Sequence, residues 1–181
     1  LGQLKKANYS NTKIAENLLA ALFRQIYEEG FFHADPHPGN IAISSSQQII
    51  FYDFGQVGVI NGLVKEHCID LLMSMIGHDV DGVTRALLAI GVSSQHVNRQ
   101  DLKQDVARLE QKYYGLPLSQ VKLGLALAEL LELSTRYQVR IPAELSLLVK
   151  MLMTIESLIA QLDPQISIVD IAEPYGRRIM Q

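Results

Sequence analysis

Apolar residues recur every three or four positions along most of this chain, and the pattern is interrupted only between residues 31 and 62. This period places the apolar side chains on one face of a helix. It predicts helices over residues 12–29, 63–77, 79–90, 98–114, 118–137, 143–162 and 167–179. Asn11 or Thr12 is expected to cap the first helix and Gly30 to end it, and Asp79 is expected to cap the third.

The interruption contains two short apolar runs, residues 41–43 and 49–52, with the polar run 44–48 between them. This arrangement predicts a β-hairpin, and residues 31–40, rich in Pro, Gly, His and Asp, are expected to form a loop. If Ile41 pairs with Tyr52, Asn40 lies opposite Asp53, with Cβ atoms roughly 5 Å apart. The expected fold class is therefore mainly α with a small β-hairpin.

Composition excludes several classes of protein. The chain has 181 residues, which suits one domain or one large lobe, and 48% of them are hydrophobic, enough for a core. Net charge is −3 without a cluster of Lys and Arg, so no nucleic-acid partner is expected. The single cysteine, Cys68, excludes an internal disulfide. Glu144, Lys150 and Glu156 interrupt the most apolar stretch, which is not expected to span a membrane.

Residues with catalytic potential gather on either side of the hairpin, in H-A-D-P-H-P-G-N (33–40) and D-F-G (53–55). The Asn40 amide oxygen and the Asp53 carboxylate are ligands that suit Mg²⁺. Asp35, five residues before Asn40, could accept a proton from a substrate hydroxyl. The order H-x-D-x-x-x-x-N followed by D-F-G is that of kinase-type phosphoryl transfer. We expect His33 to support the loop, and His37 to support it or to contact a phosphate.

Residues 30–40, GFFHADPHPGN, resemble the catalytic loop of the ABC1/UbiB/ADCK family of atypical kinases. DFGQVG at 53–58 resembles the metal-binding motif of that family, and segments at 79–82, 162–164 and 172–175 are also similar. The resemblance covers nearly the whole chain. It implies a protein-kinase-like C-terminal lobe over residues 1–181, comprising the catalytic loop 31–40, the metal-binding motif 53–55 and a helical remainder, 63–179.

Matched residue by residue, the resemblance places Asp35 on the catalytic Asp of the family, and Asn40 and Asp53 on its metal and cofactor ligands. It implies Mg²⁺ with ATP or ADP, and a role linked to ubiquinone or other isoprenoid-quinone lipids. The implied partners are a nucleotide, an isoprenoid lipid or quinone precursor, and a membrane contacted peripherally. The chain itself carries no targeting signal, so its location stays open. The resemblance implies the cytoplasm or the periphery of an inner membrane in bacteria, mitochondria or plastids.

A complete kinase site also needs an N-terminal lobe that carries a small-residue phosphate loop and a Lys–Glu pair. No such elements precede His33, so we expect this chain to lack the N-lobe and to be inactive in isolation. A helix is expected within eight residues of Gly58, without an Ala-Pro-Glu motif. This favours a small-molecule or lipid substrate, or ATP hydrolysis, over protein phosphorylation.

Several alternatives stay open at this point. Aminoglycoside- and choline-kinase-like enzymes share the first motif, but Phe54-Gly55 after Asp53 favours the ABC1 type. A zinc or dinuclear hydrolase could use His33, Asp35, His37 and Asp53. The chain could also be a catalytically dead module that binds lipid or a membrane protein through its helices, and the polar residues could serve turns alone.

Overall fold

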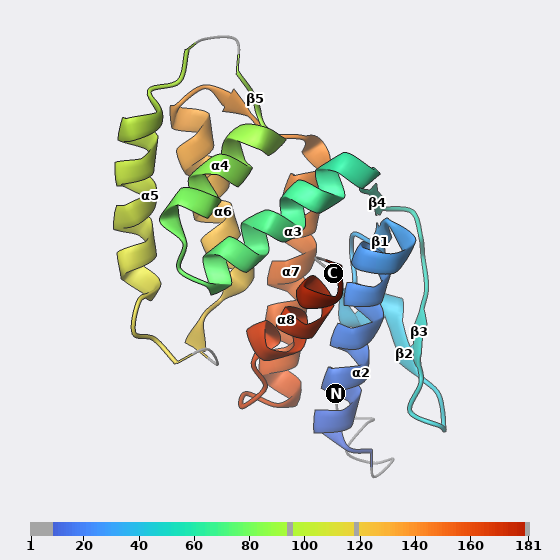
Figure 1. The fold of residues 1–181 in the computed structure, drawn as a ribbon. Helices are drawn as coiled ribbons and strands as arrows, with labels where there is room; N and C mark the ends of the chain where they lie inside the picture. Colours follow the sequence, from blue (N-terminus) through green and yellow to red (C-terminus); the bar gives the residue numbers. More distant parts are fainter. Residues whose placement is uncertain (1–8, 94–95, 118–119, 180–181) are drawn as a thin grey trace.

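The computed structural model describes residues 9–93, 96–117 and 120–179, and helices dominate these residues (Figure 1). This confirms the predicted mainly α-helical class. The helices are α2 (Asn11–Arg24), α3 (Gly62–Ile76), α4 (Val80–Ile90), α5 (Arg99–Tyr113), α6 (Leu123–Arg136), α7 (Ala143–Leu162) and α8 (Ile168–Ile179).

The first helix follows its predicted stripe and continues as a π-helical turn, η1 (Gln25–Glu29). Gly30 ends it with a left-handed φ of 68°, as predicted. The predicted cap was wrong, because the hydroxyl of Ser10 accepts the Lys13 N–H at 3.3 Å. Thr12 instead donates to the Asp163 carboxylate at 2.6 Å, which joins the start of α2 to the end of α7.

Three antiparallel strand pairs are present among the described residues, where the sequence predicted one. The predicted hairpin is β2 (Ile41–Ile43) with β3 (Ile49–Phe51). The two further pairs are β1 (Phe31–His33) with β4 (Val57–Val59), and β5 (Val92–Ser93) with β6 (Val139–Arg140). The prediction that residues 31–40 form a loop was therefore wrong for β1. Strands of two or three residues are too short for a period to show.

Helix α7 is the centre of the core. It spans the predicted residues and buries nine side chains, with Met151 and Ile155 fully enclosed. It contacts α2, α6 and β4 (Figure 1). By length and composition α7 would also suit a membrane span, but half of that stretch is buried inside the fold. Core packing therefore accounts for its apolar character.

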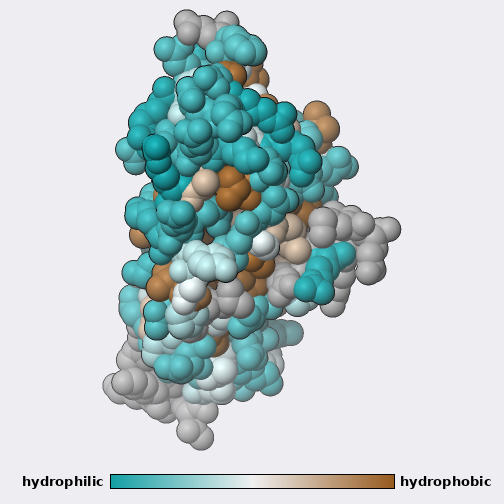
Figure 2. Space-filling view, turned by 60° about the vertical axis from the view of Figure 1, so that its left-hand side comes forward, coloured by the Kyte–Doolittle hydropathy of each residue, from teal (hydrophilic) through white to brown (hydrophobic). Residues whose placement is uncertain are grey.

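Four of the remaining helices form the second side of the molecule, and α8 packs between them and α2, against α2 and α3. Helices α3, α4, α5 and α6 pack in sequence order, each against the next (Figure 1). Asp79 caps α4 through the Gly82 N–H, as predicted. Helix α5 buries only Leu102 and Val106, and the face that includes it is mostly hydrophilic (Figure 2). Helix α6 begins at Leu123 rather than at the predicted residue 118, and residues 118–119 lie outside the described residues.

Candidate functional site

The predicted site residues lie where one long antiparallel pair of segments opens. Residues 31–34 pair with 56–59, since the β1–β4 register continues through the Ala34 N–H to the Gln56 carbonyl at 3.1 Å. Residues 40–43 pair with 49–52, since the β2–β3 register continues through the Tyr52 N–H to the Asn40 carbonyl at 2.8 Å. Between the two ladders, residues 35–39 face 53–55 without pairing in either register. Two short ladders thus hold a polar opening from both ends.

Local chemistry explains why the ladder stops here. Pro36 and Pro38 have no N–H to donate. Pro38 starts a 3-10 turn over Pro38–Asn40, and the His37 ring accepts the Gly39 N–H of this turn. On the opposite segment Asp53 has a left-handed φ of 50°, which non-glycine residues rarely adopt, although Asp and Asn do so more often than most. The Asp53 carboxylate stabilises this conformation by accepting the Gly55 N–H at 3.1 Å.

His33 joins the two sides of the opening. Its ring is fully buried, and its Nδ1 accepts the Asp35 N–H at 3.1 Å. Nε2 must then carry the proton, and it donates to the Tyr52 carbonyl at 2.7 Å. The Phe54 ring lies 5.1 Å from the His33 ring between centroids. His33 therefore connects the loop that carries Asp35 with the segment that carries Asp53.

Asp35 and His37 lie on the solvent side of the opening. The Nε2 atom of His37 is 3.8 Å from the Asp35 carboxylate, and its Nδ1 accepts the Gly39 N–H at 3.0 Å. About a third of the Asp35 side chain is exposed, with a relative accessibility of 36%. The Asp35 carboxylate is thus held next to solvent, where a substrate hydroxyl could reach it.

The predicted pairing of Asn40 with Asp53 was wrong by one residue. Asn40 faces Tyr52, and Ile41 pairs with Phe51. The turn sets this register, because Ser44 and Gln48 close a three-residue loop in which Gln47 takes the left-handed φ of 61°. Asp53 therefore follows the last ladder pair instead of belonging to it.

The donor set still suits a hard cation. The Asn40 amide group donates to the Asp35 carbonyl at 3.0 Å, which orients its oxygen away from that carbonyl. Asp53 uses one carboxylate oxygen for the Gly55 N–H, so the second oxygen can act as a ligand. An amide and a carboxylate oxygen at one end of a hairpin are ligands of the kind that Mg²⁺ prefers.

The arrangement does not favour the zinc alternative. His33 has both ring nitrogens engaged by protein groups, so it has none for a metal. Within the described part of the chain, no group of three or more His, Cys, Asp or Glu side chains could hold a metal ion.

Two exposed aromatic side chains lie at the opening. Tyr52 and Phe54 are each about half exposed, at 52% and 50%. Val59, at the far end of the β1–β4 ladder, and Leu63, in α3, are more exposed still. Large apolar groups at a polar site are typical of a surface that another part of a protein covers.

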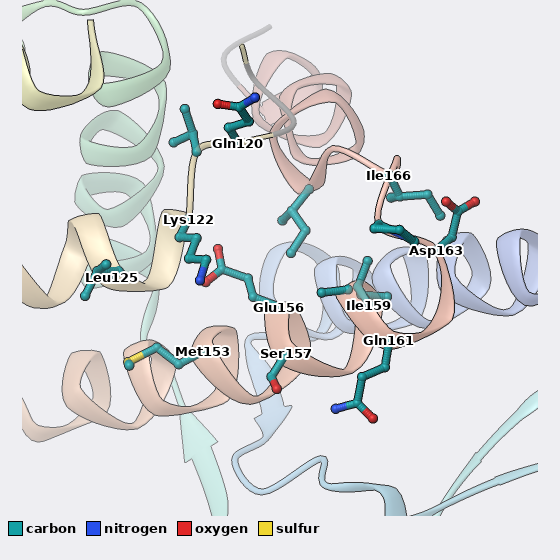
Figure 3. A pocket seen from close by; sticks show the side chains of 14 residues that line it. Gln120, Lys122, Leu125, Met153, Glu156, Ser157, Ile159, Gln161, Asp163 and Ile166 are labelled. Carbon is teal, nitrogen blue, oxygen red and sulfur yellow. The ribbon is translucent and has the colours of Figure 1, made fainter. Parts of the chain in front are cut away.

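A separate hollow of about 720 Å³ lies between the start of α6, the C-terminal half of α7 and the start of α8 (Figure 3). Leu125, Met153 and Ile159 give it apolar walls, and Glu156 and Lys122 point toward each other at its edge (Figure 3). None of the five predicted site residues lines it. Sequence periodicity could not have found this hollow, because it is formed between three helices.

Two family models match the chain. The ABC1 atypical kinase-like domain matches residues 1–87, and the UbiB helical domain matches residues 106–167. The candidate site lies within the first match, and most of α5 with all of α6 and α7 lies within the second.

Similar proteins come from bacteria and plants. A protein described by its place in the hydrogenase 1 5′ region of Clostridium pasteurianum is 33% identical over 97% of this chain and 33% of its own length. Protein ACTIVITY OF BC1 COMPLEX KINASE 7, chloroplastic, of Arabidopsis thaliana is 29% identical over 99% of this chain and 26% of its own. A Synechocystis protein, sll1770, is 28% identical over 98% and 30%. The chain thus spans about a third of the length of these relatives or less.

Proposed function

Because the chain belongs to the ABC1/UbiB family of atypical kinase-like proteins, we propose that it forms the C-terminal lobe of an ATP- and Mg²⁺-dependent phosphotransferase or ATPase. One observation carries this proposal. Asp35, Asn40 and Asp53 all border one opening between two ladders, in the order that kinase-type chemistry requires.

Each residue has a distinct role in this proposal. Asp35 accepts the proton of the attacking hydroxyl or water, since its carboxylate faces solvent beside His37. Asn40 and Asp53 would hold Mg²⁺, which when bound neutralises charge on the phosphates. His33 keeps the two segments together through its buried ring, and His37 orients the turn before Asn40. His33 and His37 are therefore supporting residues.

A second lobe would complete the site. The exposed Tyr52 and Phe54 side chains beside the opening support a partner lobe that covers them. That lobe would contribute the lysine of the Lys–Glu pair and the phosphate loop, which together hold the nucleotide. We therefore expect the isolated 181-residue chain to show little or no turnover.

The substrate we propose is a small molecule or lipid of isoprenoid-quinone metabolism. Helix α3 begins at Gly62, seven residues after Gly55, so the intervening segment is too short to seat a peptide as longer activation segments do. This short connection supports a small substrate over a protein. The link to isoprenoid quinones rests on the family.

Substitution of Asp35 by Asn tests the chemical role directly. In the full-length natural protein, Asp35→Asn should lower Mg²⁺-dependent ATP turnover by about 100-fold or more, since a general base contributes that much. Affinity for the Mg²⁺–nucleotide complex should stay within about threefold. Asp81→Asn is the matched control, because Asp81 pairs with Lys103 on the surface. Turnover in Asp35→Asn equal to that of the control would exclude Asp35 as the base.

The hollow on α7 favours a second candidate function, the binding of an isoprenoid chain by the helices. Its walls are mostly apolar, and its size is that of a ligand site. The fraction of protein that sediments with vesicles containing an isoprenoid quinone should then be unchanged in Asp53→Ala. It should fall in Met153→Glu, which places a charge in the apolar wall. Equal sedimentation of wild type and Met153→Glu would remove this candidate.

A further inference from the structure

A lysine of the core helix α7 reaches the candidate site. Lys150 Nζ donates to the Gln56 side-chain carbonyl oxygen at 2.9 Å, across 94 positions of sequence. Gln56 directly follows the D-F-G segment that carries Asp53. A hydrogen bond from an ammonium group is stronger than one between neutral groups. The helical side of the molecule therefore holds the residue next to the proposed metal-binding segment.

Gln56 also contacts the catalytic loop. Its backbone carbonyl accepts the Ala34 N–H at 3.1 Å, the last ladder bond before the opening. Ala34 is buried and directly precedes Asp35. Gln56 thus connects three parts of the molecule. It is continuous in sequence with the segment that carries Asp53, its backbone carbonyl binds the loop that carries Asp35, and its side chain binds α7.

The two ends of this connection differ in rigidity. Lys150 lies between Val149 and Met151, which are 8% and 0% exposed, so its backbone is fixed in the core. Gln56 lies on an exposed segment beside an opening without ladder pairs. A long exposed side chain has many rotamers, and a bond to a fixed partner limits them. The Lys150 contact therefore restrains Gln56 more than it restrains α7.

We propose that Lys150 is a positioning residue, which acts through Gln56 to hold the Asp53 segment in place against the Asp35 loop. This inference rests on the proposed function. Lys150 lies in the part matched by the UbiB helical domain, and Gln56 in the part matched by the kinase-like domain. The helical part thus contacts the phosphoryl-transfer site through this hydrogen bond, in addition to the packing of α7 against β4.

Four variants of the full-length natural protein test this role. Lys150→Met removes the donor and keeps the aliphatic stem, and Lys150→Arg restores a donor. Gln56→Met removes the acceptor. Lys103→Met is the charge-matched control, because its partner Asp81 lies outside the site. Amide hydrogen exchange of Ala34 and residues 55–57 is measured without nucleotide, and Mg²⁺–ADP affinity is measured separately.

We expect Lys150→Met to speed exchange at Ala34 by about three- to tenfold and to weaken Mg²⁺–ADP binding by a similar factor. Lys150→Arg should restore the wild-type exchange rate and ADP affinity, and Lys103→Met should leave both at their wild-type values. The double variant Gln56→Met/Lys150→Met should behave like Lys150→Met alone, because the two residues form one contact. Wild-type exchange in Lys150→Met would overturn the inference. Weaker ADP binding with unchanged exchange would also overturn it, because Lys150 would then contact the nucleotide directly.

The two measurements separate this inference from the proposed function. A wild-type protein that shows no Mg²⁺-dependent affinity for ADP contradicts the proposed function. The exchange rate of the Ala34 amide in the absence of nucleotide then decides by itself whether Lys150 restrains the site.

Discussion

At the scale of single residues, the order and spacing of the two motifs predicted that the segments carrying them lie close together, but not which residues face each other. His33, Asp35, His37, Asn40 and Asp53 all border one opening. Sequence could not predict how the His33 ring bonds, since its partners are backbone groups of residues 35 and 52. It also could not predict the left-handed backbone of Asp53, because Asp adopts many conformations.

His33→Ala should destabilise the fold by about 2–4 kcal/mol, because it leaves a cavity and two backbone groups without their partner. Denaturation by urea gives the free energy of unfolding. His96→Ala is the control, since His96 is exposed, and it should change stability by no more than about 0.5 kcal/mol. Similar losses in the two variants would show that the buried ring does not hold the segments together.

At the scale of elements, helices were predicted well and strand pairs poorly. A helix of fourteen or more residues repeats its apolar stripe several times, as α2 and α7 do. The hairpin was also predicted, but its register was not, because Gln47 in the turn determines it. The β1–β4 pair depends on close contact between Phe32 and Gly58, which no local pattern encodes.

Gly58→Ala tests that contact. A Cβ on Gly58 would lie 2.1 Å from Phe32 Cζ, and Phe32 is fully buried, so we expect a loss of about 1–3 kcal/mol. Gly62→Ala is the matched control, because nothing lies within 4 Å of its Cβ at the start of α3. It should be neutral or stabilise by up to about 1 kcal/mol. Thermal or urea unfolding that ranks the two variants equally would contradict the close packing of β1 on β4.

A half-buried carboxylate of α7, that of Glu156, lies at the start of α6. The Glu156 carboxylate accepts the Gly124 N–H at 3.0 Å, so a side chain of α7 caps α6. Burial raises the pKa of Glu156, and the backbone N–H groups of Gly124 and Leu123 oppose that shift. The folded state therefore binds this proton more tightly than the unfolded state does, and its contribution to stability falls as the pH rises from the ordinary Glu pKa to the raised one.

Glu156→Gln keeps an acceptor for the Gly124 N–H and removes the titration. Relative to this variant, wild type should lose stability as the pH rises from about 4 toward neutrality, where Glu titrates. Urea midpoints of both proteins between pH 4 and 8 measure the difference. A wild type that instead gains on the Gln variant as the pH rises would show that the cap lowers the pKa and that burial does not dominate.

At the scale of the whole molecule, sequence predicted the class and the family, and the structure added contacts between segments that lie far apart in sequence. Periodicity assigned α7 to a helix but could not show that Lys150 reaches Gln56 or that Glu156 caps α6. Both contacts join residues far apart in sequence, and such pairs leave no periodic signal. The hollow beside α7 escaped prediction for the same reason, since three helices form it.

The central claim is that Asp53 and Asn40 hold Mg²⁺ for a nucleotide, and calorimetric titration of the full-length natural protein with ADP tests it most directly. Wild type should bind ADP with an affinity that depends on Mg²⁺. Asp53→Asn should lose that dependence and keep the wild-type circular dichroism spectrum, since the exposed Asp53 contributes little to the core. Equal Mg²⁺-dependent affinity in the wild type and in a folded Asp53→Asn variant would contradict the assignment.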